Sequence, residues 1–449
     1  MADRDRVTAV SAPGKMLLAG GYIVLDRAYT GLVFGLSARI NVLAQEIPTS
    51  EGVHLTEIVV ESPQFLEAQW RYGYHLAEED GGIKVTQLQV GTHITPNPFV
   101  ETTLNYVLTY ITGTSKHFHK RTLKSARLTI LADNDYYSQP TSSPPSSAPS
   151  TGTGRFARFP VPLSGAHKTG LGSSAALVTA LTAALLSHYL SFDLNSPDSK
   201  LVLHNLAQAA HCAAQGKVGS GFDVAAAVYG SCSYRRFSPS VLSSLPKSGT
   251  PGFATALDNV VHGLNGVTWD TNVGKAGVGL PQGVAVRMCD VNCGSQTVGM
   301  VKQVLTWRAQ NSEAAGKLWG ELQQKNEALA DVLKGGWTDD IKEAIRAIRK
   351  LVKKMGAESG VPIEPDSQTE LLDALEGVEG VYGGVVPGAG GYDALALLLK
   401  DDEETLKRVE QFLDGWSKEK GSLVCLLGVR GEMEGIRKEE VAVYDGWVQ

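Results

Sequence analysis

The sequence predicts an α+β fold divided into two domains. Its 449 residues exceed what a single hydrophobic core usually fills, which favours two or three domains. Strand-like and helix-like segments are mixed without a regular βα alternation, which indicates α+β. Residues 238–281 are rich in serine, proline and glycine and contain the predicted domain junction. We therefore expect an N-terminal domain over 1–245, a linker over 246–280 and a C-terminal domain over 281–449.

The first segment reads as strands separated by turns. Val7–Val10 and Met16–Ala19 are apolar runs typical of strands, with a turn over residues 11–15 between them. After the Gly20-Gly21 pair the apolar run resumes as a strand over Tyr22–Leu25. Leu32–Leu43 adds a further strand.

The next segment continues the sheet and then changes character. Residues 53–95 alternate polar and apolar side chains, Asn97–Thr112 has helical spacing, and Ser125–Leu131 reads as a strand. Residues 138–154 are almost entirely serine, proline, threonine and glycine, so we expect a disordered insertion in a surface loop. Phe156–Val161 is expected to be a strand that leads into a glycine-rich loop.

The remaining elements follow from apolar periodicity and from glycine stops. After the loop at 170–172 come an apolar helix to about residue 190, a helix over Leu201–Gln215 stopped by Gly216, and a small-residue helix at Val224–Val228. The C-terminal half predicts a strand at Val284–Cys289, helices over Thr297–Leu333, a helix opened by Thr338 and ended by Gly356, a strand–glycine turn–strand unit over 378–399, a helix near 402–414 and a strand at Ser422–Val429.

Composition narrows the functional class. The net charge of −6 gives no support for nucleic-acid binding, which normally needs a basic surplus. The five cysteines are odd in number and scattered; the spacing of Cys289 and Cys293 matches neither a zinc knuckle nor a redox dithiol. Buried free thiols in a reducing compartment are expected. With a charged N-terminus and no apolar run of about 18 residues, a cytoplasmic protein is expected.

The glycine-rich loop before the long apolar helix is a candidate anion site. Glycines let backbone amides approach a ligand, and a helix start offers unpaired N–H groups and the positive end of its dipole. Phosphate is the commonest anion bound this way. The serines could cap the helix or reach a phosphate-bound magnesium, and a capped helix without ligand stays the alternative. The candidate nucleotide-binding residues are Lys168, Gly170, Leu171, Gly172, Ser173, Ser174 and Ala175.

Two more glycine-rich turns accompany this loop, Pro13-Gly14-Lys15 and Gly388–Asp393. In order, spacing and residues the three resemble the motifs of the GHMP kinases, which include galactokinase, homoserine kinase, mevalonate kinase and phosphomevalonate kinase. Within that family the chain is most similar to the fungal phosphomevalonate kinases. The stretches that carry this likeness are Ser11–Tyr22, Lys168–Leu177 and Ala210–Asp223.

The resemblance implies a fold and an activity. It implies an N-terminal α+β domain, a C-terminal ferredoxin-like α+β domain and an active site between them. The implied reaction transfers phosphate from ATP, with Mg²⁺, to (R)-5-phosphomevalonate, giving (R)-5-diphosphomevalonate in isoprenoid and sterol synthesis. Expected partners are these small molecules, with no nucleic acid and no membrane, for a monomer or homodimer.

It also implies roles for single residues. Lys15 and Asp223 correspond to catalytic residues, and Ser174 to a magnesium ligand. The implied substrate-binding residues are Lys15, Tyr22, Ser220, Asp223, Gly388, Ala389 and Gly390. From the residues alone, Asp223 could equally cap a helix, Tyr22 could be core, and Lys15 could be a solvated lysine. Lys168, Lys217, Arg155 and Arg158 are candidates for attracting an anionic substrate.

The chain departs from the family pattern at three places. Residues 167–169 stand where several relatives carry prolines, and Tyr392 replaces a common glycine of the third turn. Cys212 stands where mevalonate kinases place a magnesium-binding glutamate. Ser174, phosphates and water would therefore supply more of the magnesium shell. The alternatives are an alcohol kinase like mevalonate kinase, a silent nucleotide-binding sensor on the same fold, and a scaffold that binds partners through 138–154.

Overall fold

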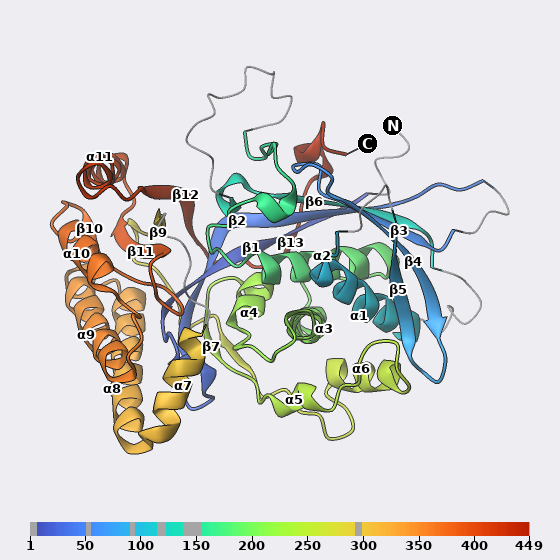
Figure 1. The fold of residues 1–449 in the computed structure, drawn as a ribbon, viewed down its shortest axis with the longest axis horizontal. Coiled ribbons are helices and arrows are strands. Elements are labelled where there is room, and N and C mark those ends of the chain that lie inside the picture. Colours follow the sequence, from blue (N-terminus) through green and yellow to red (C-terminus); the bar gives the residue numbers. More distant parts are fainter. Residues whose placement is uncertain are drawn as a thin grey trace.

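The protein is a mixed α+β structure, as predicted. The computed structural model describes residues 7–50, 55–89, 95–114, 123–137, 154–291 and 299–448. Within these ranges the strands are β1 Thr8–Ala19, β2 Gly31–Glu46, β3 Glu57–Glu61, β4 Gln69–Ala77, β5 Gly82–Leu88, β6 Ala126–Ala132, β7 Cys232–Arg235, β8 Asn272–Gly274, β9 Val284–Val291, β10 Val381–Val385, β11 Ala394–Lys400, β12 Val424–Glu432 and β13 Arg437–Lys438. They join into one sheet with the main order β10-β11-β9-β12-β2-β6-β3-β4-β5 (Figure 1). Strand β1 pairs with β2 and β13, and β7 pairs with β2 and β8.

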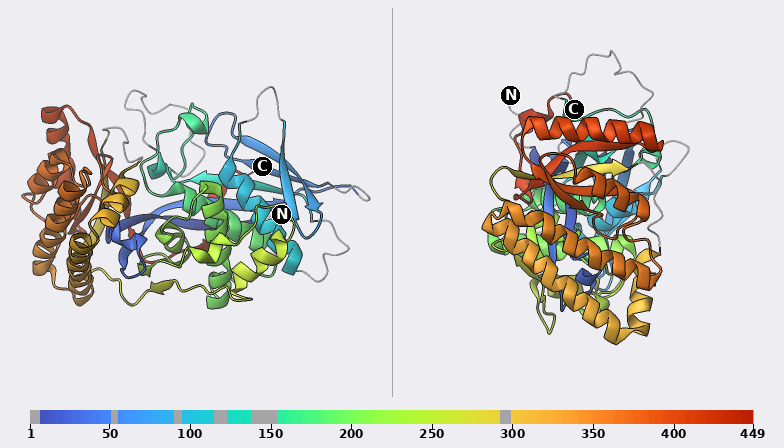
Figure 2. Two further views of the ribbon diagram at one scale, coloured as in Figure 1. Left: turned by 60° about the horizontal axis from the view of Figure 1, so that its bottom comes forward. Right: turned by 90° about the vertical axis from the view of Figure 1, so that its left-hand side faces the viewer.

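The helices form two groups on this sheet. The first is α1 Pro98–Thr114, α2 Ser173–Tyr189, α3 Pro197–Gln215, α4 Phe222–Tyr229, α5 Ser240–Ser243 and α6 Phe253–His262. The second is α7 Met300–Gln310, α8 Ser312–Gly335, α9 Ile341–Ser359, α10 Asp366–Leu375 and α11 Glu403–Lys420. Helix α2 lies against β1, β2, α1, α3 and α4, whereas α9 packs on α8 and β10, and α11 packs on β12. The turned views show the second group at the β9–β12 end of the molecule (Figure 2).

Helices α2 and α3 follow their sequence signals closely. Helix α2 is apolar on nearly all sides and buried over most of its length, as expected for a central helix. Helix α3 begins at Ser196, whose hydroxyl accepts the amide of Ser199, and has Pro197 in its first turn. It ends at Gly216, which has a φ of +67°, confirming the predicted stop.

The predictions for residues 7–25 were partly wrong. Residues 11–15 form no turn, because β1 runs through them with β2 on one edge and β13 on the other; a register shift between Pro13 and Lys15 absorbs the irregularity. Residues Tyr22–Leu25 are not a strand. Tyr22 has a φ of 65°, and the amides of Val24 and Leu25 bond the carbonyls of Gly20 and Tyr22, which gives the short 3₁₀ helix Ile23–Leu25.

Two further boundaries differ from prediction. Residues 156–161 form no strand, because Pro160 and Pro162 lack the amides that a ladder needs; Phe156 and Phe159 are nevertheless buried. Gly356 does not end its helix, since α9 continues to Ser359 and stops at Gly360, with a φ of +68°. At Gly356 a β-carbon would lie 2.8 Å from the carbonyl oxygen of Val361, so this glycine permits a close approach. Residues 138–153 of the predicted insertion lie outside the described residues.

The C-terminal segment returns to the N-terminal strands. Arg39 on β2 is buried and donates to the Ser11 hydroxyl at 2.6 Å, to the Glu432 carboxylate at 3.1 Å and to the carbonyl of Gly435. Helix α6, inside the predicted linker, packs against α1 and α3. The division into 1–245, 246–280 and 281–449 stays a prediction. No helix among the described residues is long and apolar enough to cross a membrane.

Candidate active site

The glycine-rich loop opens directly onto the start of α2. Gly172 precedes the helix with a φ of +81°, and no side chain caps the first turn. Ser173 and Ser174 therefore do not serve as caps, and the first-turn amides remain available to an anion. The carbonyl of Leu171 accepts the amide of Lys15 at 2.9 Å, which ties the loop to β1. This arrangement is the geometry of an anion site.

Lys15 lies across this loop. Its ammonium donates to the carbonyl of Gly170 at 3.1 Å, and a β-carbon on Gly172 would come within 2.8 Å of the lysine Cγ. The ammonium also stands 5.9 Å from the centre of the Phe222 ring. Burial lowers the pKa of Lys15, and the carboxylate of Asp223 offsets part of that shift. Lys15 is thus a half-buried cation beside the candidate phosphate loop.

Asp223 is positioned by a tightly held loop before α4. Arg236 donates to the carbonyls of Val218 at 3.0 Å and Gly219 at 2.7 Å, and the Tyr234 hydroxyl donates to that of Ser220 at 2.8 Å. Gly221, with a φ of +85°, occupies the N-cap position, so Asp223 is not the cap. One Asp223 oxygen accepts the amide of Val224 at 3.0 Å, and the other is directed toward His211.

His211 joins the two candidate catalytic helices, and the sequence analysis gave it no role. Its Nε2 lies 3.2 Å from the Ser174 hydroxyl, 3.2 Å from the Gln215 amide nitrogen and 4.0 Å from the Asp223 carboxylate. The side chain is buried, with its ring tilted against that of Phe99. Its only signal in the sequence was its position on the buried face of α3. A histidine in such a position is usually an ordinary core residue.

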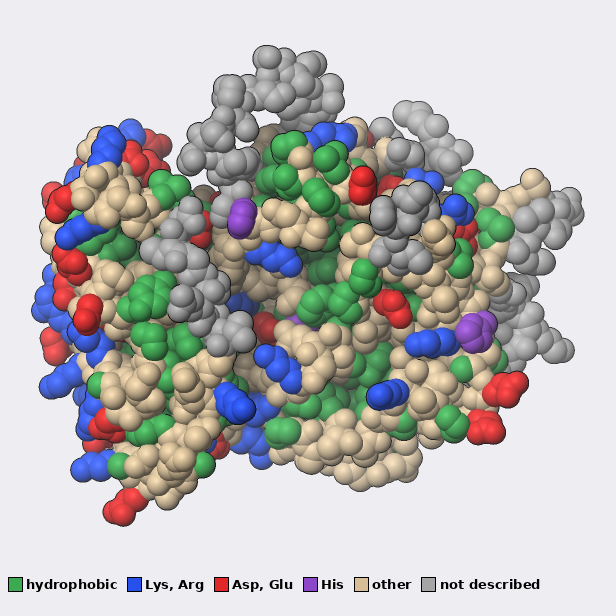
Figure 3. All heavy atoms as spheres, in the orientation of Figure 1, with side chains coloured by type: hydrophobic (Ala, Val, Ile, Leu, Met, Phe, Trp, Pro, Cys, Tyr) green, Lys and Arg blue, Asp and Glu red, His purple; other side chains and the backbone are tan. Residues whose placement is uncertain are grey.

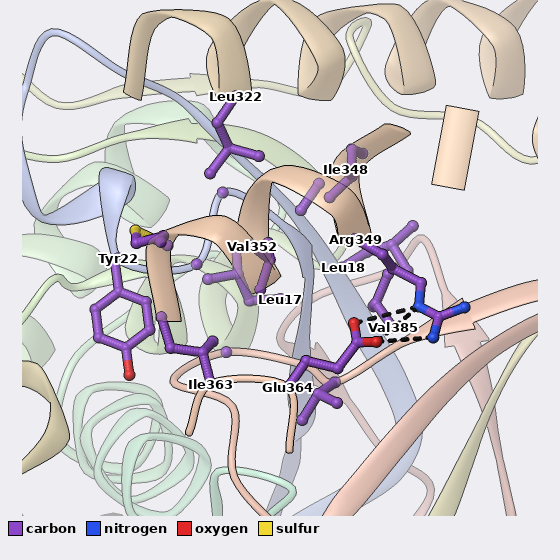
Figure 4. Close-up of a pocket in the computed structure, with 16 residues that line it drawn as sticks. Leu17, Leu18, Tyr22, Leu322, Ile348, Arg349, Val352, Ile363, Glu364 and Val385 are labelled. Atoms are coloured by element: carbon purple, nitrogen blue, oxygen red, sulfur yellow. Dashed lines mark hydrogen bonds and ion pairs between the residues drawn. The ribbon is translucent and has the colours of Figure 1, made fainter. Parts of the chain in front are cut away.

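The third turn packs on the end of β1. The amide of Gly388 donates to the carbonyl of Leu17 at 3.2 Å, and the buried Tyr22 hydroxyl donates to that of Ala389 at 2.6 Å. The turn is held from behind by the carbonyl of Ile363, which accepts the amide of Gly391 at 2.9 Å. Beyond Ile363, the Arg349 guanidinium grips the carboxylate of Glu364 at 2.7 Å (Figure 4).

Strand β1, the glycine-rich loop and the third turn line one cavity, which we call the central cleft. It measures about 350 Å³ and is lined by Lys15, Tyr22, Gly170, Ser220, Gly388 and Asp393 among others. A hollow lies between the second helix group and the rest of the molecule, with Lys and Arg side chains around it (Figure 3). The buried Oδ1 of Asp393 has no hydrogen-bond partner among the described residues. The cleft therefore combines a cation with an unused acceptor, while Ser173 and Ser174 at the start of α2 line a neighbouring pocket.

A second cavity adjoins the other side of the loop. This aromatic pocket measures about 90 Å³ and is lined by residues that include Trp70, Phe99, Tyr137, Lys168, Ser173 and Ser174. The aromatic residues come from β4, α1 and the segment after β6, so no local pattern in the sequence could have grouped them. Lys168 is exposed at its edge.

Other predicted residues lie apart from the two cavities. Lys217 is exposed. Arg155 binds Asp133 at 2.7 Å, and Arg158 lies over the Trp447 ring.

Cys212 is buried; the Gln208 amide donates to its sulfur at 3.2 Å, and burial raises the pKa of its thiol. Cys232 and Cys289 are also buried free thiols, as predicted, whereas Cys425 is exposed; Cys293 lies outside the described residues.

The donor set fits a magnesium ion that takes most of its ligands from phosphate and water. Among the described residues no group of three His, Cys, Asp or Glu side chains could hold a metal. The Ser174 hydroxyl stands at the start of α2, and the Asp223 carboxylate lies across His211 from it. One or two oxygen ligands from the protein are what Mg²⁺ commonly takes at nucleotide sites.

Comparison with known proteins gives a consistent picture. Residues 158–231 match the model of the GHMP kinases N terminal domain. The chain is 64% identical to a phosphomevalonate kinase of Gibberella zeae over 100% of both chains. It is 47% identical to that of Aspergillus fumigatus, covering 98% of this chain and 99% of the relative. The solved Streptococcus pneumoniae phosphomevalonate kinase, in complex with phosphomevalonate and AMPPNP, shares the fold with a TM-score of 0.59 and 17% identity, covering 96% and 99% of the two chains.

Proposed function

The chain belongs to the GHMP kinase family, and from this premise we propose that its central cleft transfers the γ-phosphoryl group of ATP to (R)-5-phosphomevalonate. Its activity is that of a phosphomevalonate kinase, an ATP-dependent kinase whose acceptor is a phosphate group. The product is (R)-5-diphosphomevalonate, which feeds isoprenoid and sterol synthesis. The single observation that carries this assignment is the 64% identity over the full chain.

The proposed roles follow from the geometry around Lys15. Phosphoryl transfer requires positioning and charge stabilisation more than covalent help from the protein. The open amides at the start of α2 hold the nucleotide phosphates, and Lys15 neutralises charge on the transferred group. Because Lys15 bonds both to the loop and, through its backbone, to Leu171, any shift of the loop also moves the cation.

Magnesium and the acceptor occupy opposite sides of Lys15 in this proposal. Ser174 would supply a hydroxyl ligand to magnesium, which would offset the charge of the nucleotide phosphates. The acceptor lies in the central cleft against Tyr22, Ser220 and the third turn. Asp393 offers its unused oxygen to the acceptor's hydroxyl, the uncharged donor on this substrate.

We place the enzyme in the cytoplasm. The support is the set of buried free thiols at Cys212, Cys232 and Cys289, which fits a reducing compartment. Imaging of the full-length chain with an internal tag would test the location.

The direct test is ADP release by the purified protein with Mg·ATP, offering phosphomevalonate and mevalonate in separate reactions. Turnover with phosphomevalonate alone is expected. Turnover with mevalonate alone would identify an alcohol kinase instead. Nucleotide binding without turnover on either acceptor would identify a silent sensor.

Replacing Asp223 by asparagine is expected to reduce kcat by less than the roughly 10²–10⁴-fold that losing a general base costs. An alcohol acceptor must lose a proton, but a phosphate monoester has its second pKa near 6 and is already mostly dianionic at neutral pH. Asp223 then mainly orients Lys15. Steady-state kinetics at pH 7.5 measure the effect, with thermal unfolding as the folding control. A loss larger than that range on a folded variant would mean that Asp223 is the base.

Replacing Trp70 by leucine is expected to raise the KM for ATP roughly tenfold, because an aromatic face stacked on a base is worth about 1–3 kcal/mol. We place the adenine in the aromatic pocket, on the support of its Trp70, Phe99 and Tyr137 lining, so kcat at saturating ATP should change little. The matched control is Trp337→Leu, since Trp337 is 58% exposed and lines neither cavity. An unchanged KM for ATP would put the base elsewhere.

A further inference from the structure

The Ser174 hydroxyl is held by one nitrogen of a buried histidine. His211 Nε2 lies 3.2 Å from the Ser174 Oγ, and His211 itself is 2% exposed. Helices α1, α2 and α4 all pack against α3, so the histidine stands where the four helices meet. A side chain enclosed in this way has little freedom to leave the hydroxyl.

The groups around Nε2 indicate which way the proton points. The Gln215 amide nitrogen, which can only donate, approaches Nε2 at 3.2 Å. Nε2 is therefore the acceptor in this arrangement, which corresponds to the tautomer with its proton on Nδ1. The Ser174 hydroxyl, the second group near Nε2, also donates to it and shares its single lone pair with the Gln215 amide. The Asp223 oxygen, at 4.0 Å, is beyond hydrogen-bond distance.

Donation by Ser174 has a consequence for its oxygen. A hydroxyl has one proton and two lone pairs, and a cation can be bound only through a lone pair. When the proton is directed at His211, both lone pairs are left free to bind a cation. Neither Cys212, whose sulfur faces Gln208, nor any capping bond competes for this hydroxyl.

We propose that His211 is a positioning residue for the magnesium-nucleotide complex, acting through the Ser174 hydroxyl. It accepts a hydrogen bond from the serine hydroxyl and so leaves the oxygen lone pairs directed toward the phosphate-bound cation. This inference rests on the proposed function and names a component of the same site. Its role is not catalytic in the strict sense, because the imidazole touches neither substrate nor metal.

The test compares two variants of the full-length protein in a binding assay without turnover. His211→Leu removes the acceptor at similar volume, whereas His211→Gln can place an amide oxygen close to the position of Nε2. Affinity for AMPPNP is measured by calorimetry with and without Mg²⁺. We expect His211→Leu to bind Mg·AMPPNP roughly tenfold more weakly, on the order of one hydrogen bond, with metal-free binding unchanged. His211→Gln should recover most of the loss.

A double-mutant cycle identifies the route of the effect. If His211 acts through the serine, then Ser174→Ala combined with His211→Leu should be no weaker than Ser174→Ala alone. Should the leucine variant fold poorly, His211→Phe keeps a flat ring against Phe99, and the same loss is expected.

Two results would overturn the inference. The first is a His211→Leu variant whose affinity for AMPPNP depends on Mg²⁺ as in the wild type. The second is an equal loss of affinity in the leucine and glutamine variants, which would indicate packing alone. Failure of the proposed function would appear separately, as a wild type that binds Mg·AMPPNP but does not turn over phosphomevalonate.

Discussion

Replacing Lys15 by methionine is expected to lower kcat for phosphomevalonate by about 10²–10³-fold, the cost of removing one preorganised charge-stabilising donor. Methionine retains most of the apolar stem that lies against Gly172, so the loop should keep its shape. The melting temperature should therefore move little, and KM less than kcat. Steady-state kinetics with both substrates varied measure the effect.

The matched control is Lys317→Met, an exposed lysine of α8 that lines neither cavity. A loss below tenfold in a folded Lys15→Met variant would remove Lys15 from the mechanism. The wild type offers a second check through pH. Burial lowers the pKa of Lys15, so the free enzyme loses its charge at a lower pH than an ordinary lysine. Bound phosphate raises that pKa again; kcat/KM should therefore fall at lower pH than kcat as the pH rises.

The second large effect is expected from Gly172→Ala compared with Gly170→Ala. Both glycines have a positive φ, +81° and +75°, so an alanine strains each backbone by about 1–2 kcal/mol. Only at Gly172 would the new β-carbon collide with another residue, at 2.8 Å and 2.9 Å from Cγ and Cε of Lys15. At Gly170 it would meet nothing within 4 Å. The two variants should lose similar stability but differ in activity.

We expect kcat/KM to fall roughly 100-fold for Gly172→Ala and by no more than about tenfold for Gly170→Ala. The reason is that only Gly172→Ala displaces the Lys15 ammonium, to which we assign the stabilisation of the transferred group. Thermal unfolding measures the shared backbone strain, and kinetics measure the difference. Combining Gly172→Ala with Lys15→Met should add little to Lys15→Met alone. Equal activities of the two alanine variants would show that the collision is relieved without moving Lys15.

Local signals in the sequence predicted the elements better than their contacts. Gly216 ends α3 as expected, since a helix stop depends on one residue and its neighbours. Residues 11–15 read as a turn because proline and glycine usually disfavour strands. They lie within a strand because β2 pairs with one edge of β1 and β13, distant in sequence, pairs with the other. The helix end predicted at Gly356 was wrong for a similar reason, because this glycine permits the close approach of the Val361 carbonyl.

The site shows the same division. Family resemblance and glycine chemistry identified the loop, Lys15, Ser174 and Asp223 in the sequence. The structure places Gly170 and Lys15 at the central cleft and Ser174 at the aromatic pocket, with Asp223 4.0 Å from His211. His211 and Trp70 could not be found in this way. The roles proposed for them rest on four packed helices and on a pocket assembled by β4, α1 and the segment after β6, and no spacing along the chain encodes these neighbours.

The two-sided pairing of β1 ties the folding of this strand to the progress of translation. The strand that carries Lys15 leaves the ribosome long before its partner β13, at Arg437–Lys438. Until those residues emerge, one edge of β1 at Val10 and Ser11 is unpaired, and the buried guanidinium of Arg39 lacks the Glu432 carboxylate and the Gly435 carbonyl. Lys15 thus stands on a strand whose pairing is completed only after β13 has been translated.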